Sequence, residues 1–212
     1  MSISMKGIDV STFQKSVKWP EVKEAGIEFA ILREGYGQGS KDAMFESHYT
    51  GAKKAGIPIG AYHYTYSLTV QQAVNEAKAC MKNIAGRTLE FPVYYDIETS
   101  SIEKLSKKAI TDMIIAFCST IEKEGYFAGV YANTNWLRTK MNLSELEGRF
   151  TIWQADYRAK PDNAIKRDIL QYSSKGQIKG IAGDVDLDTC TRDFPSTIKR
   201  VGLNGYKKPA SA

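Results

Sequence analysis

Residues suited to redox or metal chemistry are scarce in this chain of 212 residues. It has three cysteines, Cys80, Cys118 and Cys190, which are far apart in sequence, and two histidines, His48 and His63. An odd number of separated cysteines argues against a disulfide framework and against a zinc site. We therefore expect reduced, structural cysteines, no bound metal and no cofactor. His63 is interpreted as a packed strand residue rather than a catalyst.

Long apolar runs and clustered charge of one sign are also missing. No segment approaches the ~20 apolar residues that span a bilayer, and residues 1–6 lack the basic start and apolar stretch of a signal peptide. The formal net charge is +5, but Lys and Arg are interleaved with Glu, as in residues 122–124. We therefore expect a protein made in the cytoplasm, with no membrane span and no affinity for nucleic acid.

Two short motifs are incomplete. The glycine-rich segment 35–39 lacks the Gly-Lys-Ser/Thr ending of a phosphate loop. Residues 184–188 begin like a calcium loop, but the glycine and the distal glutamate of such a loop are missing. We interpret the first segment as a loop beside a functional cleft and the second as a strand.

The chain does contain a regular alternation of strand-like and helix-like segments. Eight strands are predicted, at 6–11, 29–33, 57–66, 91–98, 126–133, 150–157, 169–173 and 185–188. Helices are predicted at 19–25, 43–55, 70–84 and 102–124, with a broken helical stretch at 136–146. Strand–helix alternation favours parallel strands, and eight strands favour a closed α/β barrel. The expected fold is TIM-like, with five helical connections followed by three strands without helices, (β/α)5(β)3.

The most informative segment is Tyr94–Glu98, which follows the apolar run 91–93. Alternate side chains of a strand share a face, so Tyr94, Asp96 and Glu98 are expected to point the same way. Two carboxylates one pleat apart repel each other and need solvation or partners. The same pair suits an acid that must hold a proton beside one that must stay charged.

Acids also stand near the ends of two other predicted strands, Asp9 in the first and Asp186 in the eighth. The first and eighth strands close a barrel, so these two acids would be neighbours, and the fourth strand lies across from them. Functional groups of such a barrel gather at the C-terminal ends of its strands. Asp9, Asp96, Glu98 and Asp186 are therefore expected to converge on one cleft.

Aromatic and amide side chains accompany the predicted acids. Tyr62 and Tyr64 share one face of the third strand, and Tyr131 and Asn133 share one face of the fifth. Aromatic rings offer apolar area for stacking on sugar faces, although the same rings also suit a barrel core. The candidate substrate-binding residues are Tyr62, Tyr64, Tyr94, Tyr131, Asn133, Trp153 and Gln171.

Together these residues resemble glycoside hydrolase family 25, the muramidases often called Chalaropsis-type lysozymes. The matching pieces are 7–11, 60–64, 92–98, 129–131, 153–155, 171–173 and 185–188, in the family's order. Asp188 departs from the family, where Asn is common, and residues 33–36 are a variable stretch. The resemblance implies hydrolysis of the β-1,4 bond between N-acetylmuramic acid and N-acetylglucosamine in bacterial peptidoglycan. It also implies that Glu98 is the proton donor and that Asp9, Asp96 and Asp186 complete the site.

Two mechanisms stay open for Asp96. In the usual retaining scheme it attacks the anomeric carbon directly. In the other scheme the substrate's own N-acetyl group attacks, while Asp96 orients and stabilises it. We favour the second, because the substrate carries that group and because acids two residues apart suit an acid and a helper. Glu98 then donates a proton to the leaving oxygen and later deprotonates water.

Three rival interpretations remain: a chitinase-like hydrolase, a non-catalytic peptidoglycan-binding barrel and a purely structural barrel. The first requires further acids at the positions of Phe91 and Tyr94, and the other two leave the four acids unexplained. We expect residues 1–201 to form a monomeric catalytic barrel and residues 202–212 a C-terminal tail or linker. Because a signal peptide is lacking, a phage-type lysin that reaches the cell wall after release is favoured.

Overall fold

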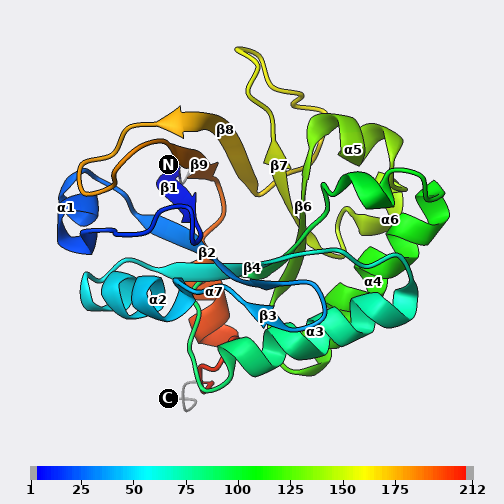
Figure 1. Ribbon diagram of the computed structural model, residues 1–212, viewed down its shortest axis with the longest axis horizontal. Helices are drawn as coiled ribbons and strands as arrows, with labels where there is room; N and C mark the ends of the chain where they lie inside the picture. The colour runs from blue at the N-terminus through cyan, green and yellow to red at the C-terminus, as the bar shows by residue number, and fades with distance from the viewer. Residues whose placement is uncertain (1–3, 209–212) are drawn as a thin grey trace.

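Eight strands close into a barrel in the computed structural model, which describes residues 4–208 (Figure 1). They are β1 Met5–Val10, β2 Phe29–Tyr36, β4 Ile59–Tyr64, β5 Val93–Asp96, β6 Ala128–Asn133, β7 Thr151–Ala155, β8 Ile169–Gly176 and β9 Val185–Cys190. The short β3, Ser40–Lys41, pairs with the end of β2. Within the barrel, neighbouring strands from β1 to β8 are parallel, and β9 runs antiparallel to β8 and β1, whereas β3 outside the barrel is antiparallel to β2. The predicted TIM-like α/β barrel is confirmed.

Helices occupy the first five connections between barrel strands, and the last two connections have none, as predicted. The helices are α1 Trp19–Glu24, α2 Phe45–Lys54, α3 Val70–Ile84, α4 Lys107–Lys123, α5 Thr134–Thr139, α6 Leu143–Leu146 and α7 Phe194–Val201, with a 3-10 turn η1 at Ser100–Ile102. Within residues 4–208, no helix combines the length and the apolar character needed to cross a membrane.

Two details differ from the sequence prediction. The helix predicted at 102–124 is divided into η1 and α4, because the Ser106 hydroxyl caps α4 by accepting the Ala109 N–H at 3.2 Å. The prediction also missed α7, although its start carries the usual signals. Asp193 caps it, accepting the Ser196 N–H at 2.9 Å, and Pro195 lies in its first turn.

Alternation along the strands sorts the apolar side chains into two cores. In β2, Ala30 and Leu32 face outward and pack in the layer between the barrel and its helices. Phe29 and Ile31 face inward, among the aromatic side chains that fill the barrel. Because the interior is filled, a functional cleft must lie at an end of the barrel rather than along its axis.

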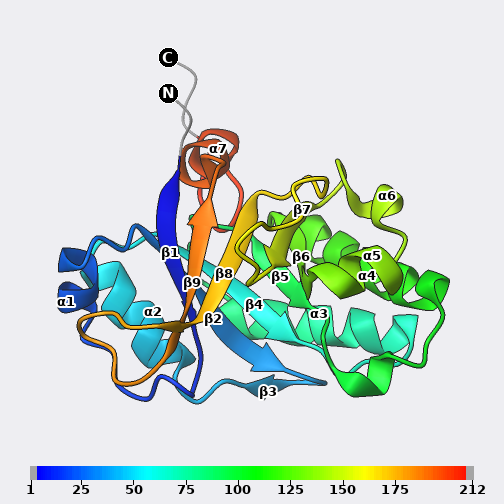
Figure 2. The same ribbon diagram turned by 90° about the horizontal axis from the view of Figure 1, so that it is seen from above.

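The end of the barrel where β1 begins is closed by α7 (Figure 2). Phe194 of α7 packs against Phe91 and Phe127, with ring centroids 5.6 and 5.7 Å away. Asn204 follows it and is fully buried. Its amide donates to the Phe91 carbonyl at 2.8 Å, and its Oδ1 accepts the Phe127 N–H at 2.6 Å. The segment 202–208 therefore contacts the barrel.

The domain division at residue 201 stays a prediction. Residues 209–212 of the predicted tail or linker, and residues 1–3 of the N-terminal segment, lie outside the described residues.

We expect Asn204→Ala to destabilise the fold by about 2–4 kcal/mol, because it leaves a buried carbonyl and a partly buried N–H of the backbone without partners. Asn204 also has a φ of 54°, so Asn204→Gly is expected to cost about 1 kcal/mol less than Asn204→Ala. Urea unfolding measures both free energies. The exposed Asn75 of α3 is the matched control, and Asn75→Ala is expected to change stability by no more than about 0.5 kcal/mol. Equal stability of Asn204→Ala and the wild type would contradict the assigned role.

Candidate active site

A cleft of about 240 Å³ lies at the C-terminal ends of the parallel strands. Asp9 of β1, Asp96 of β5, Glu98 just after β5 and Asp186 of β9 all line it, and we call it the acidic cleft. Tyr62, Tyr64, Tyr131, Trp153, Gln171, Tyr157 and Arg33 are among its other walls. The convergence expected from the strand order is therefore present in the structure.

Strand register explains how acids distant in sequence meet. Asp9 is paired with Asp186 across the β1–β9 seam that closes the barrel. On the other side, Asp96 lies between Tyr64 of β4 and Tyr131 of β6 in the parallel register. β5 ends at Asp96, so Glu98 stands beyond the strand, where its side chain is exposed to the cleft. The buried and the exposed acid thus follow each other at one strand end.

Gln171 of β8 holds Asp9 in place. Its Nε2 donates to Asp9 Oδ2 at 2.7 Å. Its Oε1 accepts two phenol protons, from Tyr131 at 2.9 Å and from Tyr157 at 2.7 Å. Because both ends of the amide are engaged, its orientation is determined. Gln171 therefore links an acid on one side of the cleft to two aromatic rings on the other.

The pair Asp96 and Glu98 is shifted toward the protonated state. Burial, followed by the charge of Glu98, raises the pKa of Asp96 well above its usual value. Partial loss of solvent inside the cleft, followed by the charge of Asp186, raises the pKa of Glu98. Oδ1 of Asp96 is buried and has no hydrogen-bond partner among the described residues. Such an oxygen is available to a donor brought by a substrate.

Asp188 of β9 is a fifth acid at this end of the barrel, and the sequence did not lead us to expect it in the site. It is fully buried, and its Oδ1 accepts the Trp153 indole N–H at 2.8 Å. Burial raises the pKa of Asp188 to about 8. Burial, with the charges of Asp188 and Asp186, also raises the pKa of Asp9 well above its usual value. Asp188 stands two residues after Asp186, so the two-residue period of a strand was the signal available in the sequence.

Two of the proposed binding residues lie outside the acidic cleft. Tyr94 has no exposed surface, and its ring lies against Gly129, where a Cβ would come within 2.6 Å of the ring. It belongs to the barrel core, beneath Trp153, and has no area to offer a sugar. Asn133 lines a neighbouring cavity, and its side chain caps α5 by accepting the Trp136 N–H at 3.0 Å.

The acidic cleft shares lining residues with two further cavities, one toward each end, and we call the three spaces together the groove. The aromatic cavity, about 610 Å³, is lined by Phe13, Tyr36, Tyr64, Tyr66, Arg33, Lys41 and Glu98, among others. The Asn133 cavity, about 310 Å³, includes Asn133, Asn135, Tyr131, Tyr157, Arg158 and Glu98. Glu98 is common to all three spaces. Arg33 continues the inward face of Phe29 and Ile31 at the end of β2, so strand alternation could have found it. Phe13 and Tyr157 lie in loops, and Tyr36 follows a strand irregularity within the segment expected beside the cleft, so no periodic pattern indicated them.

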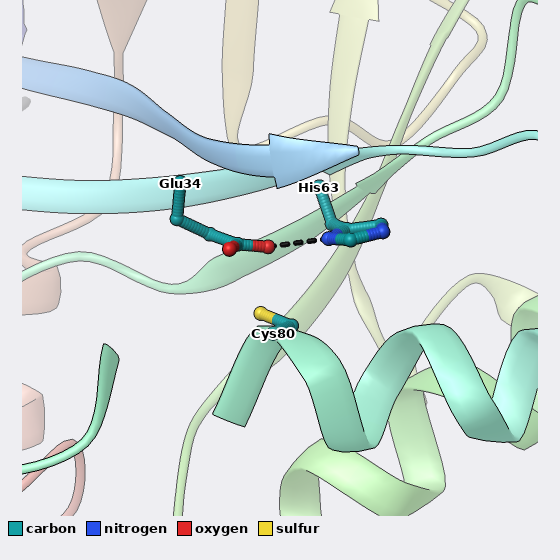
Figure 3. A group of neighbouring side chains, drawn as sticks. All are labelled: Glu34, His63 and Cys80. Atoms are coloured by element: carbon teal, nitrogen blue, oxygen red, sulfur yellow. Dashed lines mark hydrogen bonds and ion pairs between the residues drawn. The ribbon is translucent and has the colours of Figure 1, made fainter. Parts of the chain in front are cut away.

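A second titratable cluster, Glu34–His63–Cys80, lies outside the cleft (Figure 3). All three side chains are buried between the barrel strands, which carry Glu34 and His63, and α3, which carries Cys80. His63 Nε2 donates to the Gly37 carbonyl at 2.9 Å, and His63 Nδ1 contacts the Glu34 carboxylate. Burial opposes a charge on His63, but the Glu34 carboxylate outweighs burial and raises the pKa of His63. A protonated imidazole beside a carboxylate satisfies both groups, and His63 is a packed strand residue, as predicted.

Comparison with protein families gives a match to glycosyl hydrolases family 25 over residues 8–181. This range includes Asp9, Asp96 and Glu98 and ends before Asp186. The autolytic lysozyme of Clostridium acetobutylicum is 31% identical over 185 residues, which make up 87% of this chain and 55% of that protein. The chain thus spans little more than half the length of this relative.

Solved structures give the same result. The CTP1L endolysin superposes with a TM-score of 0.81 at 29% identity, covering 92% of this chain and 69% of that chain. The bacterial lysozyme from Streptomyces coelicolor superposes with a TM-score of 0.80 at 26% identity, covering 89% of this chain and 93% of that chain. The similarity therefore extends over the whole barrel and not over a local motif.

Asp188 is expected to make the protein less stable as the pH rises. An unfolded aspartate has a pKa of about 3.9, whereas the pKa of Asp188 in the fold is about 8. Between these values the unfolded chain releases the proton and the folded chain keeps it, so stability falls with increasing pH. Asp188→Asn removes this loss. We expect the variant to be more stable than the wild type at pH 8 by at least about 1 kcal/mol, and the advantage to shrink toward pH 5.

Urea unfolding at several pH values between 5 and 8 measures this difference. Asp184, just before β9, is exposed, and Asp184→Asn is the control that is expected to follow the wild-type curve. An Asp188→Asn curve parallel to that of the wild type would show that Asp188 does not keep its proton in the fold.

Proposed function

Because this chain belongs to glycosyl hydrolases family 25, we propose that it is an N-acetylmuramidase, a lysozyme. Its substrate is bacterial peptidoglycan, and the bond cut is the β-1,4 bond between N-acetylmuramic acid and N-acetylglucosamine. The observation that carries this proposal is the meeting of Asp96 and Glu98 with two further acids in one open cleft. A binding protein or a structural barrel has no use for several acids whose mutual repulsion costs stability.

Glu98 acts as the general acid and then as the general base. It is the acid most exposed to the cleft, so a glycosidic oxygen can reach it. Loss of solvent and the charge of Asp186 raise its pKa, which keeps a proton on Glu98 at higher pH than on a free glutamate. After the leaving group departs, the Glu98 carboxylate removes a proton from the attacking water.

Asp96 assists the substrate's own N-acetyl group rather than attacking the sugar itself. Attack requires a full negative charge, and burial raises the pKa of Asp96 and disfavours that charge. Accepting a hydrogen bond from the acetamido N–H requires less negative charge on Asp96 than attack on the sugar does. The unpartnered Oδ1 supplies the acceptor for it. The acetamido oxygen then attacks the anomeric carbon as the leaving group departs, which forms a five-membered oxazolinium ring. Water attacks the anomeric carbon, opens this ring and gives a product with retained configuration.

The remaining walls hold the sugar. Asp9 and Asp186 face the same cleft and accept sugar hydroxyls, and Gln171 keeps Asp9 oriented. Tyr62 and Tyr131 are almost buried and shape the floor, whereas Tyr64 and the half-exposed Tyr157 offer ring surface. No residue of this scheme requires a metal ion, and the chain is proposed to act as a monomer on the bacterial cell wall.

Glu98→Gln is expected to lower kcat by at least ~100-fold, because the amide cannot donate the required proton. Activity is measured as reducing ends released from purified cell walls, and mass spectrometry of the products identifies the new reducing sugar. Glu103→Gln is the control, since Glu103 is exposed and lines none of the three cavities; it is expected to keep wild-type activity. N-acetylglucosamine instead of N-acetylmuramic acid at the new reducing end would refute the assigned bond.

The role of Asp96 is tested on glycan strands whose N-acetyl groups on muramic acid are replaced by N-trifluoroacetyl groups. Fluorine withdraws electrons from the carbonyl oxygen, so we expect kcat to fall at least ~10-fold if that oxygen attacks the sugar. Strands with N-propionyl groups control for size and are expected to react at nearly the normal rate. Detection of a sugar ester on Asp96 in quenched reactions would favour direct attack instead.

A further inference from the structure

Among residues 4–208, Arg33 is the one cation that lines the acidic cleft, and only part of its guanidinium is bonded to other residues. Its Nε donates to Asp42 Oδ2 at 2.7 Å. Asp42 is itself held by the N–H groups of Thr12 and Met44, at 3.0 and 2.8 Å. The two terminal nitrogens of Arg33 make no hydrogen bond to any residue between 4 and 208, and they are not among the buried atoms lacking a partner. Both nitrogens therefore keep some exposed surface, and Arg33 lines the acidic cleft.

The position of Arg33 connects two spaces. It lines the acidic cleft and the aromatic cavity, as Glu98 does. The rings of Phe13 and Tyr36 lie 5.3 and 5.6 Å from its guanidinium carbon. Contacts of this kind and the bond to Asp42 hold the guanidinium in one orientation. A planar fork that is fixed at one edge and free at the other is suited to a carboxylate.

The other end of the groove has an arginine with the opposite arrangement. Arg158, in the Asn133 cavity, makes a bidentate ion pair with Asp156. Its Nε donates to Oδ1 at 2.8 Å and its Nη2 donates to Oδ2 at 2.6 Å. The Arg158 guanidinium beside Asp156 holds the pKa of that carboxyl well below its usual range. Arg158 is thus committed to a protein partner, and the two ends of the groove differ in their capacity for an anion.

We propose that Arg33 binds a carboxylate carried by the lactyl arm of the substrate's muramic acid. This inference rests on the proposed function. Apart from the lactyl arm of muramic acid, the sugars of the glycan carry no charge. The negative groups available are therefore the lactyl carboxylate, where no peptide is attached, and the carboxylates of the stem peptide, where one is. Arg33 and Glu98 line the same two spaces, so under the proposed function Arg33 lies close to the muramic acid whose bond Glu98 cleaves. The aromatic cavity then receives the arm, and Arg33 is a specificity residue.

The test compares kcat/KM on matched polymers. One polymer is peptidoglycan stripped of its peptides by an amidase, which leaves free lactyl carboxylates, and a second is intact peptidoglycan. Each is also prepared with its carboxylates converted to methylamides. We expect the wild type to prefer the charged form of at least one polymer by about 10- to 100-fold, as a charged hydrogen bond implies. A preference confined to the intact polymer assigns the stem peptide, and a preference on the stripped polymer assigns the lactyl carboxylate.

Arg33→Met is expected to abolish this preference, and Arg33→Lys to keep part of it. The readout is the ratio of kcat/KM between the charged and the methylamidated polymer, and not the rate itself, because Arg33 also influences Asp96. Burial and Glu98 raise the pKa of Asp96 and Arg33 opposes them, so removing Arg33 alters the rate on every polymer. Arg158→Met is the control and is expected to leave the preference at its wild-type value, whatever its effect on rate.

Three results overturn the inference: a wild type indifferent to methylamidation, an undiminished preference in Arg33→Met, or a loss of preference in Arg158→Met as well. The first result is independent of whether any variant folds. If the wild type releases no reducing ends from any of these polymers, the proposed function fails, which is a different outcome from cleavage without preference.

Discussion

The crowding of carboxylic acids at one end of the barrel is the constraint on which the rest of the structure depends. Five acids gather there, namely Asp9, Asp96, Glu98, Asp186 and Asp188, and each has a raised pKa. Burial and mutual repulsion make them costly to ionise, so this end of the barrel weakens the fold as the pH rises. The filled interior and the closure by α7 and Asn204 offset that cost at the other end.

Hydrogen bonds from residues at the floor of the cleft fix the orientation of two of these acids. Gln171 and Trp153 each give an N–H to a buried acid, Asp9 and Asp188 respectively. These bonds orient the acids without neutralising them, because neither donor carries a charge. Each bond lowers the pKa of its acid, but burial raises both pKa values by more. Glu98, whose pKa is also raised, stands at the surface of the cleft.

The two ends of the groove are chemically unequal. Arg33 and the aromatic rings of Phe13 and Tyr36 form one end, and the Arg158–Asp156 pair forms the other. A glycan strand has a direction, and its charged substituents occur on alternate sugars. Under the proposal for Arg33, the aromatic cavity receives the charged arm of the muramic acid, whereas the arginine of the Asn133 cavity is already paired with Asp156.

Much of this molecule was determined by local sequence. Apolar periodicity and glycine stops defined the strands and helices, and the order of strands was enough to predict that Asp9, Asp96 and Asp186 meet. Only the tertiary structure decided how each group is used. Tyr94 shares the inward face of β5 with Asp96 but lies deeper in the barrel, where Gly129 leaves room for its ring. Arg33 has one edge of its guanidinium held by Asp42, which comes from a distant turn. Periodicity describes which face a side chain takes, but burial, free donors and pKa depend on neighbours from other strands, which no local pattern contains.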